Sequence, residues 1–129
     1  MSDAGQTMLA AVYEGDQSVS VRELPVPEPG HGEVLIAVSH CGICGSDLHF
    51  VVEGWSAPGS VHGHEYSGEI VALGPGTEGW QVGDRVAGGP ARGCGECRPC
   101  RAGAVHLCAN RPAFGAEPFQ GAFATYKRL

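Results

Sequence analysis

The chain has 129 residues, with 14 acidic and 8 basic side chains and a formal net charge of −6. This balance argues against nucleic acid or an anionic membrane as the partner, because both attract basic surfaces. Hydrophobic residues make up 43% of the chain and charged residues 17%, which is typical of one folded globular domain rather than a disordered chain. The 21 glycines and 9 prolines favour short strands joined by turns.

Short strands are predicted over most of the chain, at residues 7–13, 18–24, 33–39, 67–73, 85–87 and 122–127. The first two flank the turn Glu14-Gly15-Asp16 and predict a β-hairpin. Residues 25–30 contain three prolines and predict an extended connector. The third strand is rich in branched apolar residues, so we expect it to be buried. It leads directly to Cys41.

One short helix is predicted after Cys44. Ser46 or Asp47 could cap its first turn, and the residues from Leu48 onward allow one or two turns before Gly54. Residues 55–60 are predicted to form a loop.

Residues 74–79 match the G-x-G-x-x-G pattern and follow a predicted strand, as a dinucleotide-binding fingerprint does. That fingerprint also requires a helix whose N-terminus faces the pyrophosphate. Residues 80–84 instead carry further turn signals and no helical period. We therefore interpret the segment as a turn between strands and predict no cofactor-binding residue in this chain.

Four cysteines follow the spacing C-x2-C-x2-C-x7-C at Cys94, Cys97, Cys100 and Cys108. Four thiolates close a tetrahedral zinc site with no open position, which is typical of structural zinc. Neighbouring arginines, Arg92, Arg98 and Arg101, partly offset the thiolate charge. A bacterial iron–sulfur run has its fourth cysteine after three residues and before proline, unlike this chain. We predict a structural zinc lobe at about residues 90–111.

Thiol, imidazole and carboxylate groups also gather in residues 41–65, where spacing leaves two arrangements open. Cys41 and Cys44 could form a zinc knuckle with two cysteines of the lobe, or the stretch could form a catalytic zinc site with an open position. His62 and His64 are two residues apart, so on an extended backbone both face one side and either could bind the metal. The isolated histidines are interpreted as surface or core residues: His31, His40 and His106.

Several motifs occur in a fixed order: Cys44-Gly45-Ser46-Asp47-Leu48-His49, Gly63-His64-Glu65 followed by Gly68, Gly83-Asp84-Arg85-Val86, the four cysteines and Gly121-Ala122-Phe123-Ala124. Together they resemble the N-terminal GroES-like domain of the zinc-dependent medium-chain alcohol dehydrogenases, nearest to the sorbitol and threonine dehydrogenase branches. The resemblance covers nearly the whole chain. It implies a mainly β fold, a partly open antiparallel β-barrel with short helices and a four-cysteine zinc lobe.

The resemblance also implies a set of metal-site residues. Cys44 and His64 match the catalytic-zinc ligands, and Glu65 matches the adjacent acidic residue that approaches the metal. Asp47 matches the carboxylate that orients the zinc-binding imidazole. Cys41 matches no ligand, and we expect it to be a small buried thiol.

The implied function is the catalytic part of an NAD- or NADP-linked alcohol or polyol dehydrogenase, in which a zinc-bound alkoxide gives hydride to nicotinamide. Ser46 matches the hydroxyl that takes the proton of the small-molecule alcohol, and His49 matches the outer end of the proton relay. Family members continue into a Rossmann cofactor domain, which also brings a third protein ligand for the catalytic zinc and a segment that returns to the barrel.

We therefore expect the cofactor to bind only through a domain absent from this chain, and the chain alone to be inactive. We also expect it to self-associate, because strand edges and apolar surface would be uncovered. No segment resembles an export signal or a membrane span, and six cysteines without such a signal favour a cytoplasmic, reducing compartment.

Two other classes stay open. A stand-alone zinc-binding interaction module without catalysis would keep the four cysteines but would not need Ser46 and His49. A co-chaperone would share the barrel but would not be expected to carry ligands for two metals.

Overall fold

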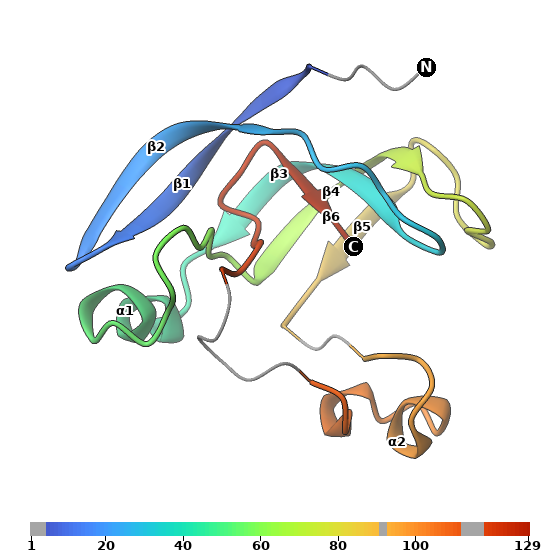
Figure 1. Ribbon diagram of the computed structural model, residues 1–129. Helices are drawn as coiled ribbons and strands as arrows, with labels where there is room; N and C mark the ends of the chain where they lie inside the picture. Colours follow the sequence, from blue (N-terminus) through green and yellow to red (C-terminus); the bar gives the residue numbers. More distant parts are fainter. Residues whose placement is uncertain (1–4, 91–92, 112–117) are drawn as a thin grey trace.

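The computed structural model describes residues 5–90, 93–111 and 118–129 (Figure 1). Its strands are β1 (Thr7–Gly15), β2 (Ser18–Pro25), β3 (Val34–Gly42), β4 (Glu65–Leu73), β5 (Arg85–Gly88) and β6 (Tyr126–Arg128). Its helices are α1 (Gly45–Val52), α2 (Arg98–Arg101) and the 3-10 helix η1 (Val105–Leu107). The predicted mainly β class with short helices is confirmed. None of the helices in the described ranges is long and apolar enough to cross a membrane.

The predicted hairpin is confirmed, because β1 and β2 pair antiparallel from Thr7 opposite Pro25 to the turn. Asp16 and Gln17 at the turn both have positive φ, 47° and 62°. Two successive left-handed residues give a turn whose twist matches the flanking strands. The side-chain amide of Gln17 donates to the carbonyl of Val52 at 3.1 Å, which ties the turn to the end of α1.

The second sheet has four antiparallel strands in the order β5-β4-β3-β6. β3 extends beyond the predicted residue 39 because its pairing with β4 continues as far as Gly42 opposite Glu65. β4 correspondingly begins at Glu65 rather than at residue 67. This register brings the segment after β3 and the segment before β4 side by side, and the candidate site lies there.

The predicted strand at 122–127 is wrong over its first part. Only Tyr126–Arg128 forms β6, which pairs with β3. The preceding residues bond elsewhere: the carbonyl of Phe123 accepts from Ala11 in β1 at 2.8 Å, and its N–H donates to the carbonyl of His62 at 2.8 Å. An isolated bridge also joins Ala124 to β1. The segment changes partners instead of following one strand, and it links the two sheets.

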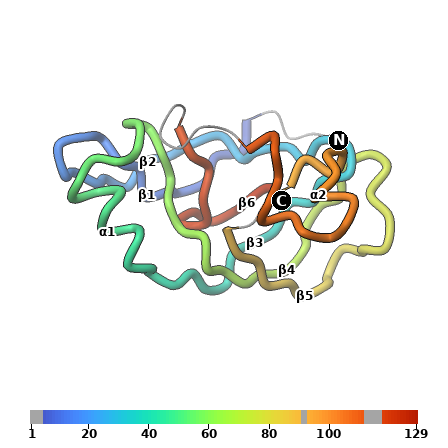
Figure 2. The backbone as a smooth tube through the Cα atoms, turned by 90° about the horizontal axis from the view of Figure 1, so that it is seen from below, coloured from blue at the N-terminus to red at the C-terminus, as the bar shows by residue number. Residues whose placement is uncertain are grey.

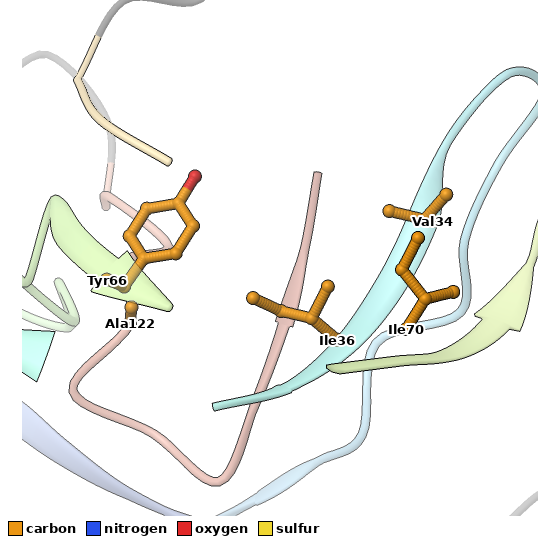
Figure 3. Close-up of a cluster of buried hydrophobic side chains, with 5 residues drawn as sticks. All are labelled: Val34, Ile36, Tyr66, Ile70 and Ala122. Atoms are coloured by element: carbon orange, nitrogen blue, oxygen red, sulfur yellow. The ribbon is translucent and has the colours of Figure 1, made fainter. Parts of the chain in front are cut away.

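Among the described residues the core forms two clusters. The larger one joins the four-stranded sheet to the segment before β6 and contains Val34, Ile36, Tyr66, Ile70 and Ala122 (Figure 3). The smaller one joins the hairpin to the segment before β4 and contains Ala10, Val12 and Val61. Because residues from distant parts of the chain meet in each cluster, burial fixes how the hairpin, the sheet and the candidate site lie relative to one another.

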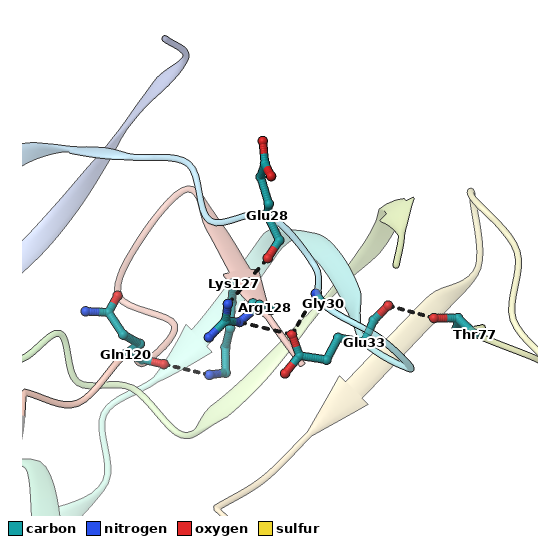
Figure 4. A network of polar contacts seen from close by, with 7 residues as sticks. All are labelled: Glu28, Gly30, Glu33, Thr77, Gln120, Lys127 and Arg128. Carbon is teal, nitrogen blue, oxygen red and sulfur yellow. Dashed lines mark hydrogen bonds and ion pairs between the residues drawn. The ribbon is translucent and has the colours of Figure 1, made fainter. Parts of the chain in front are cut away.

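A polar network holds the start of β3 to the last strand and to the loop between β4 and β5 (Figure 4). One carboxylate oxygen of Glu33 lies 3.2 Å from Nε of Arg128 and accepts the N–H of Gly30 at 2.8 Å. The backbone carbonyl of Glu33 accepts from the hydroxyl of Thr77 at 2.8 Å.

The loop between β4 and β5 contains the G-x-G-x-x-G match at 74–79. Its residues form turns, and β5 follows without a helix anywhere in this fully described stretch. The N–H of Gly74 donates to the carbonyl of Glu33 at 2.8 Å, and a Cβ on Gly74 would collide with the carbonyl oxygen of Gly30. The interpretation as a turn is confirmed. The loop lies at the opposite end of the molecule from α1 (Figure 2).

Candidate metal centres

Cys44 ends the connection from β3 and is the N-cap residue of α1, with an extended backbone (φ −85°, ψ 153°). One carboxylate oxygen of Asp47 accepts the N–H of Cys44 at 2.8 Å, and the N–H of Asp47 donates to the carbonyl of Cys44 at 3.0 Å. This is capping-box geometry, in which the third helical residue reaches back to the cap. The helix therefore begins two or three residues earlier than a cap at Ser46 or Asp47 predicts, and two hydrogen bonds to Asp47 hold Cys44 in place.

Cys44, His64 and Glu65 form one potential ligand group, with ligand atoms all within 4.8 Å of one another. Cys44 and His64 are half-buried and Glu65 is exposed. A thiol, an imidazole and a carboxylate are the ligand types that zinc prefers. The geometry gives no support to the knuckle arrangement, because Cys97 and Cys100 group with the other two cysteines of the lobe.

The side chain of Asp47 is buried, and its second oxygen, Oδ1, has no hydrogen-bond partner among the described residues. This oxygen lies 3.6 Å from Nδ1 of His64. On the other side of the ring, Nε2 of His64 lies 3.3 Å from the hydroxyl of Ser46. A carboxylate beside Nδ1 fixes the orientation of the imidazole and leaves Nε2 available to bind a metal. The residues present therefore fit a zinc ion, with a hydroxyl beside it.

His49 lies on the exposed side of α1, where its Nδ1 is 2.7 Å from Oε1 of Glu53. Its ring also stacks on Trp55, with centroids 4.9 Å apart and planes 14° from parallel. The sequence analysis did not single out Glu53 or Trp55. The spacing of four residues between His49 and Glu53 on a helix was the available signal for the first contact.

His62 is buried and does not belong to the ligand group. Its ring stacks on Phe50 at 4.8 Å and on Phe119 at 6.1 Å between centroids. Burial holds the pKa of His62 below its ordinary value. The prediction that His62 and His64 share one face is wrong, because Gly63 between them has a φ of 96° and the backbone is not extended there.

Cys41 is half-buried rather than fully buried, and burial raises the pKa of its thiol. It belongs to neither ligand group found among the described residues. A Cβ on Gly63 would lie 2.7 Å from the sulfur of Cys41 and 2.8 Å from the backbone nitrogen of Phe123. Glycine therefore allows the segment carrying His64 to pass close to β3.

The second ligand group is the predicted lobe, where the sulfur atoms of Cys94, Cys97, Cys100 and Cys108 all lie within 4.8 Å of one another. Two short helices, α2 and η1, connect these cysteines and were not predicted. Part of the predicted range, residues 91 and 92 with the side chain of Arg92, lies outside the described residues.

The thiols of the lobe differ in acidity. Hydrogen bonds from the backbone N–H groups of Cys97 and Glu96 and from the side chain of Asn110 lower the pKa of Cys94 to about 6. The N–H of Gly95 lowers the pKa of Cys100, but burial and the neighbouring thiols outweigh it and raise that pKa to about 11. Four thiols this close cannot all ionise without a cation between them. The donor set therefore fits a tetrahedral zinc ion, and the predicted four-cysteine lobe is confirmed as a cluster.

Comparison with known proteins places these features in a family. Residues 30–129 match the alcohol dehydrogenase GroES-like domain. The chain is 40% identical to a sorbitol dehydrogenase of Bacillus subtilis in an alignment 129 positions long that covers 96% of this chain and 36% of the relative. It is 42% identical to an L-threonine 3-dehydrogenase of Alteromonas mediterranea in an alignment 118 positions long that covers 88% of this chain and 34% of the relative.

Two solved dehydrogenase structures have a fold similar to that of this chain. A cobalt- and zinc-bound thermostable alcohol dehydrogenase from Pyrobaculum aerophilum superposes with a TM-score of 0.83 at 31% identity, over 96% of this chain and 39% of that one. A zinc-binding dehydrogenase from Sinorhizobium meliloti, bound to NADP, gives a TM-score of 0.80 at 36% identity, over 97% of this chain and 36% of that one. The chain thus spans a little over a third of the length of these relatives.

Proposed function

Because the chain belongs to the alcohol dehydrogenase GroES-like domain family, we propose that it is the catalytic domain of a zinc-dependent, NAD(P)-linked alcohol or polyol dehydrogenase. The observation that carries this proposal is the convergence of Cys44, His64 and Glu65, with the Ser46 hydroxyl 3.3 Å from Nε2 of His64. A module that only bound metal for stability would not need a hydroxyl at that position.

In this proposal Cys44 and His64 hold the catalytic zinc, with Glu65 next to it, and the four cysteines of the lobe hold the structural zinc. Zinc at the first site would supply a Lewis acid that makes an alcohol easier to deprotonate. Asp47 keeps the His64 ring oriented through Nδ1. It also holds Cys44 through the backbone N–H, so one buried carboxylate positions both ligands.

Ser46 and His49 handle the proton. The Ser46 hydroxyl would accept a hydrogen bond from the substrate alcohol and, before hydride transfer, take its proton while giving up its own hydroxyl proton. That proton would pass outward to His49, which is half-exposed and can exchange it with solvent. A bound nicotinamide would supply the hydride acceptor, and the protein would supply alignment and electrostatics.

The nicotinamide cofactor is proposed to bind in another part of a longer protein, since the chain spans only 36% of the sorbitol dehydrogenase that it resembles. The 129 residues alone would then be inactive.

Self-association is part of the proposal, supported by large apolar side chains that are mostly exposed, such as Val21 at 72% and Ile43 at 75%. The four thiols of the lobe bind metal only when reduced, which supports a cytoplasmic compartment.

Paired cysteine variants in a full-length protein containing this chain test the proposal. We expect Cys44→Ser to abolish NAD(P)-linked alcohol oxidation and to lower the zinc content. Cys41→Ser should leave both nearly unchanged, because the Cys41 thiol lies outside both ligand groups. If Cys41→Ser removed a metal ion while Cys44→Ser did not, the knuckle arrangement would be correct and the proposal wrong.

A further inference from the structure

His49, a member of the proposed proton relay, forms a hydrogen bond with Glu53. Glu53 has no role in the function proposed above. Glu53 is the C-cap residue of α1, and its backbone N–H donates to the carbonyl of His49 at 3.1 Å. A carboxylate at a helix C-terminus faces the negative end of the helix dipole, which is unfavourable for the helix. The helix dipole therefore does not explain a glutamate at this position.

The hydrogen bond between the two side chains joins one defined atom of each. Oε1 of Glu53 lies 2.7 Å from Nδ1 of His49, which is the length of a charge-assisted hydrogen bond. The Trp55 ring stacks on the same imidazole, with ring centroids 4.9 Å apart, and fixes the plane of the imidazole. A carboxylate only accepts, so Nδ1 must carry the proton. The neutral ring then keeps its open lone pair on Nε2.

We propose that Glu53 is a positioning residue for the relay, holding His49 in the tautomer whose Nε2 accepts the relayed proton. This inference rests on the function proposed above. In the relay, Nε2 receives the proton and the ring becomes an imidazolium with protons on both nitrogens. The carboxylate of Glu53 then faces a full positive charge. Release of the Nε2 proton to a solvent base returns the ring to its starting tautomer, so Glu53 itself neither gains nor loses a proton.

The tautomer can be measured directly on the zinc-loaded chain of 129 residues. The probe is long-range proton–nitrogen correlation of the ¹⁵N-labelled His49 ring, at about pH 9, where an ordinary imidazole is neutral. We expect Nδ1 to carry the proton in the wild type. In Glu53→Ala the signals should shift toward the other tautomer, and Glu53→Gln should lie between, because its amide oxygen still accepts. Glu78→Ala removes an exposed glutamate at the far end of the molecule and should change nothing.

A wild-type ring protonated on Nε2, or a Glu53→Ala spectrum identical to wild type, would overturn the inference. A kinetic experiment in the full-length protein separates it from the proposed function. We expect Glu53→Ala to lower kcat/KM about two- to fivefold, as befits a half-exposed pair, and to add nothing in a His49→Gln background. If His49→Gln lowers kcat/KM and Glu53→Ala does not, the positioning role of Glu53 is wrong but the proposed relay stands. If neither variant lowers kcat/KM, the proposed proton relay through His49 is wrong.

Discussion

The buried imidazole of His62 is the least satisfied polar group among the described residues. Neither of its ring nitrogens has a hydrogen-bond partner within that part of the chain, and the residue is only 5% exposed. It lines a cavity of about 200 Å³ between β1 and α1, whose other lining side chains are mainly apolar. A buried polar group without a partner costs about 1–3 kcal/mol, so His62 is expected to lower the stability of the fold.

We therefore expect His62→Leu to raise the free energy of unfolding by about 1 kcal/mol near pH 8, since the lost ring stacking offsets part of the gain. The gain should increase below about pH 6.5. There the unfolded chain binds a proton that folded His62, with its lowered pKa, does not take up. Urea unfolding of the metal-free chain at both pH values measures this. The control, exposed His40→Leu, should change stability little at either pH. A destabilised His62→Leu would show that the ring nitrogens are paired after all.

For single residues, the sequence predicted which side chains belong to the candidate metal sites better than it predicted how those side chains are arranged. The spacing of His62 and His64 suggested one shared face, but at the left-handed Gly63 the backbone is not extended, and His62 stacks on Phe50 while His64 meets that ring edge-on. Glycine permits that conformation without requiring it, so spacing alone could not decide. The grouping of Cys44 with His64 depends on a strand pairing between residues far apart in the chain, and it was anticipated only through the resemblance.

Among the elements, those with a local pattern were predicted and those that depend on distant partners were not. The hairpin, β3, β4 and β5 follow from apolar alternation and turn residues, with errors of a few residues at their ends. The predicted final strand was too long, because its first residues bond to β1 and to the segment before β4. The two short helices of the lobe have no hydrophobic period of their own, so nothing in the sequence signalled them.

The loop between β4 and β5 gives a prediction at the element scale. A side chain on Gly74 would meet backbone atoms of Gly30 and Glu33, which cannot move without disturbing the start of β3. Gly74→Ala should therefore lower the free energy of unfolding by about 2–3 kcal/mol, the cost of overpacking. Gly79→Ala is the matched comparison. The Cβ added there would meet no atom within 4 Å, so the only strain comes from the left-handed backbone at φ 77°. It should cost about 1 kcal/mol. Equal losses in denaturant unfolding would contradict this role for Gly74.

The two ligand groups differ most at the scale of the whole molecule. The lobe draws all four of its thiols from 15 consecutive residues of this chain, Cys94 to Cys108, and is complete within it. The other group offers a thiol and an imidazole, both half-buried, and an exposed carboxylate. Because the relatives are almost three times longer, completion of the second site is proposed to come from elsewhere in a longer protein.

Metal retention by the 129-residue chain should reveal this difference. A complete four-thiolate site binds zinc with about 10–16 kcal/mol at neutral pH, whereas fewer ligands and open access to water weaken the other site. After dialysis against a competing chelator we expect elemental analysis to find nearer one zinc than two per chain. Cys97→Ser should remove most of the retained zinc, and Cys44→Ser, the matched change in the other group, should not. Two zinc ions surviving the chelator in the wild type would mean that Cys44, His64 and Glu65 already form a closed site. In that case no ligand from another part of a longer protein would be needed.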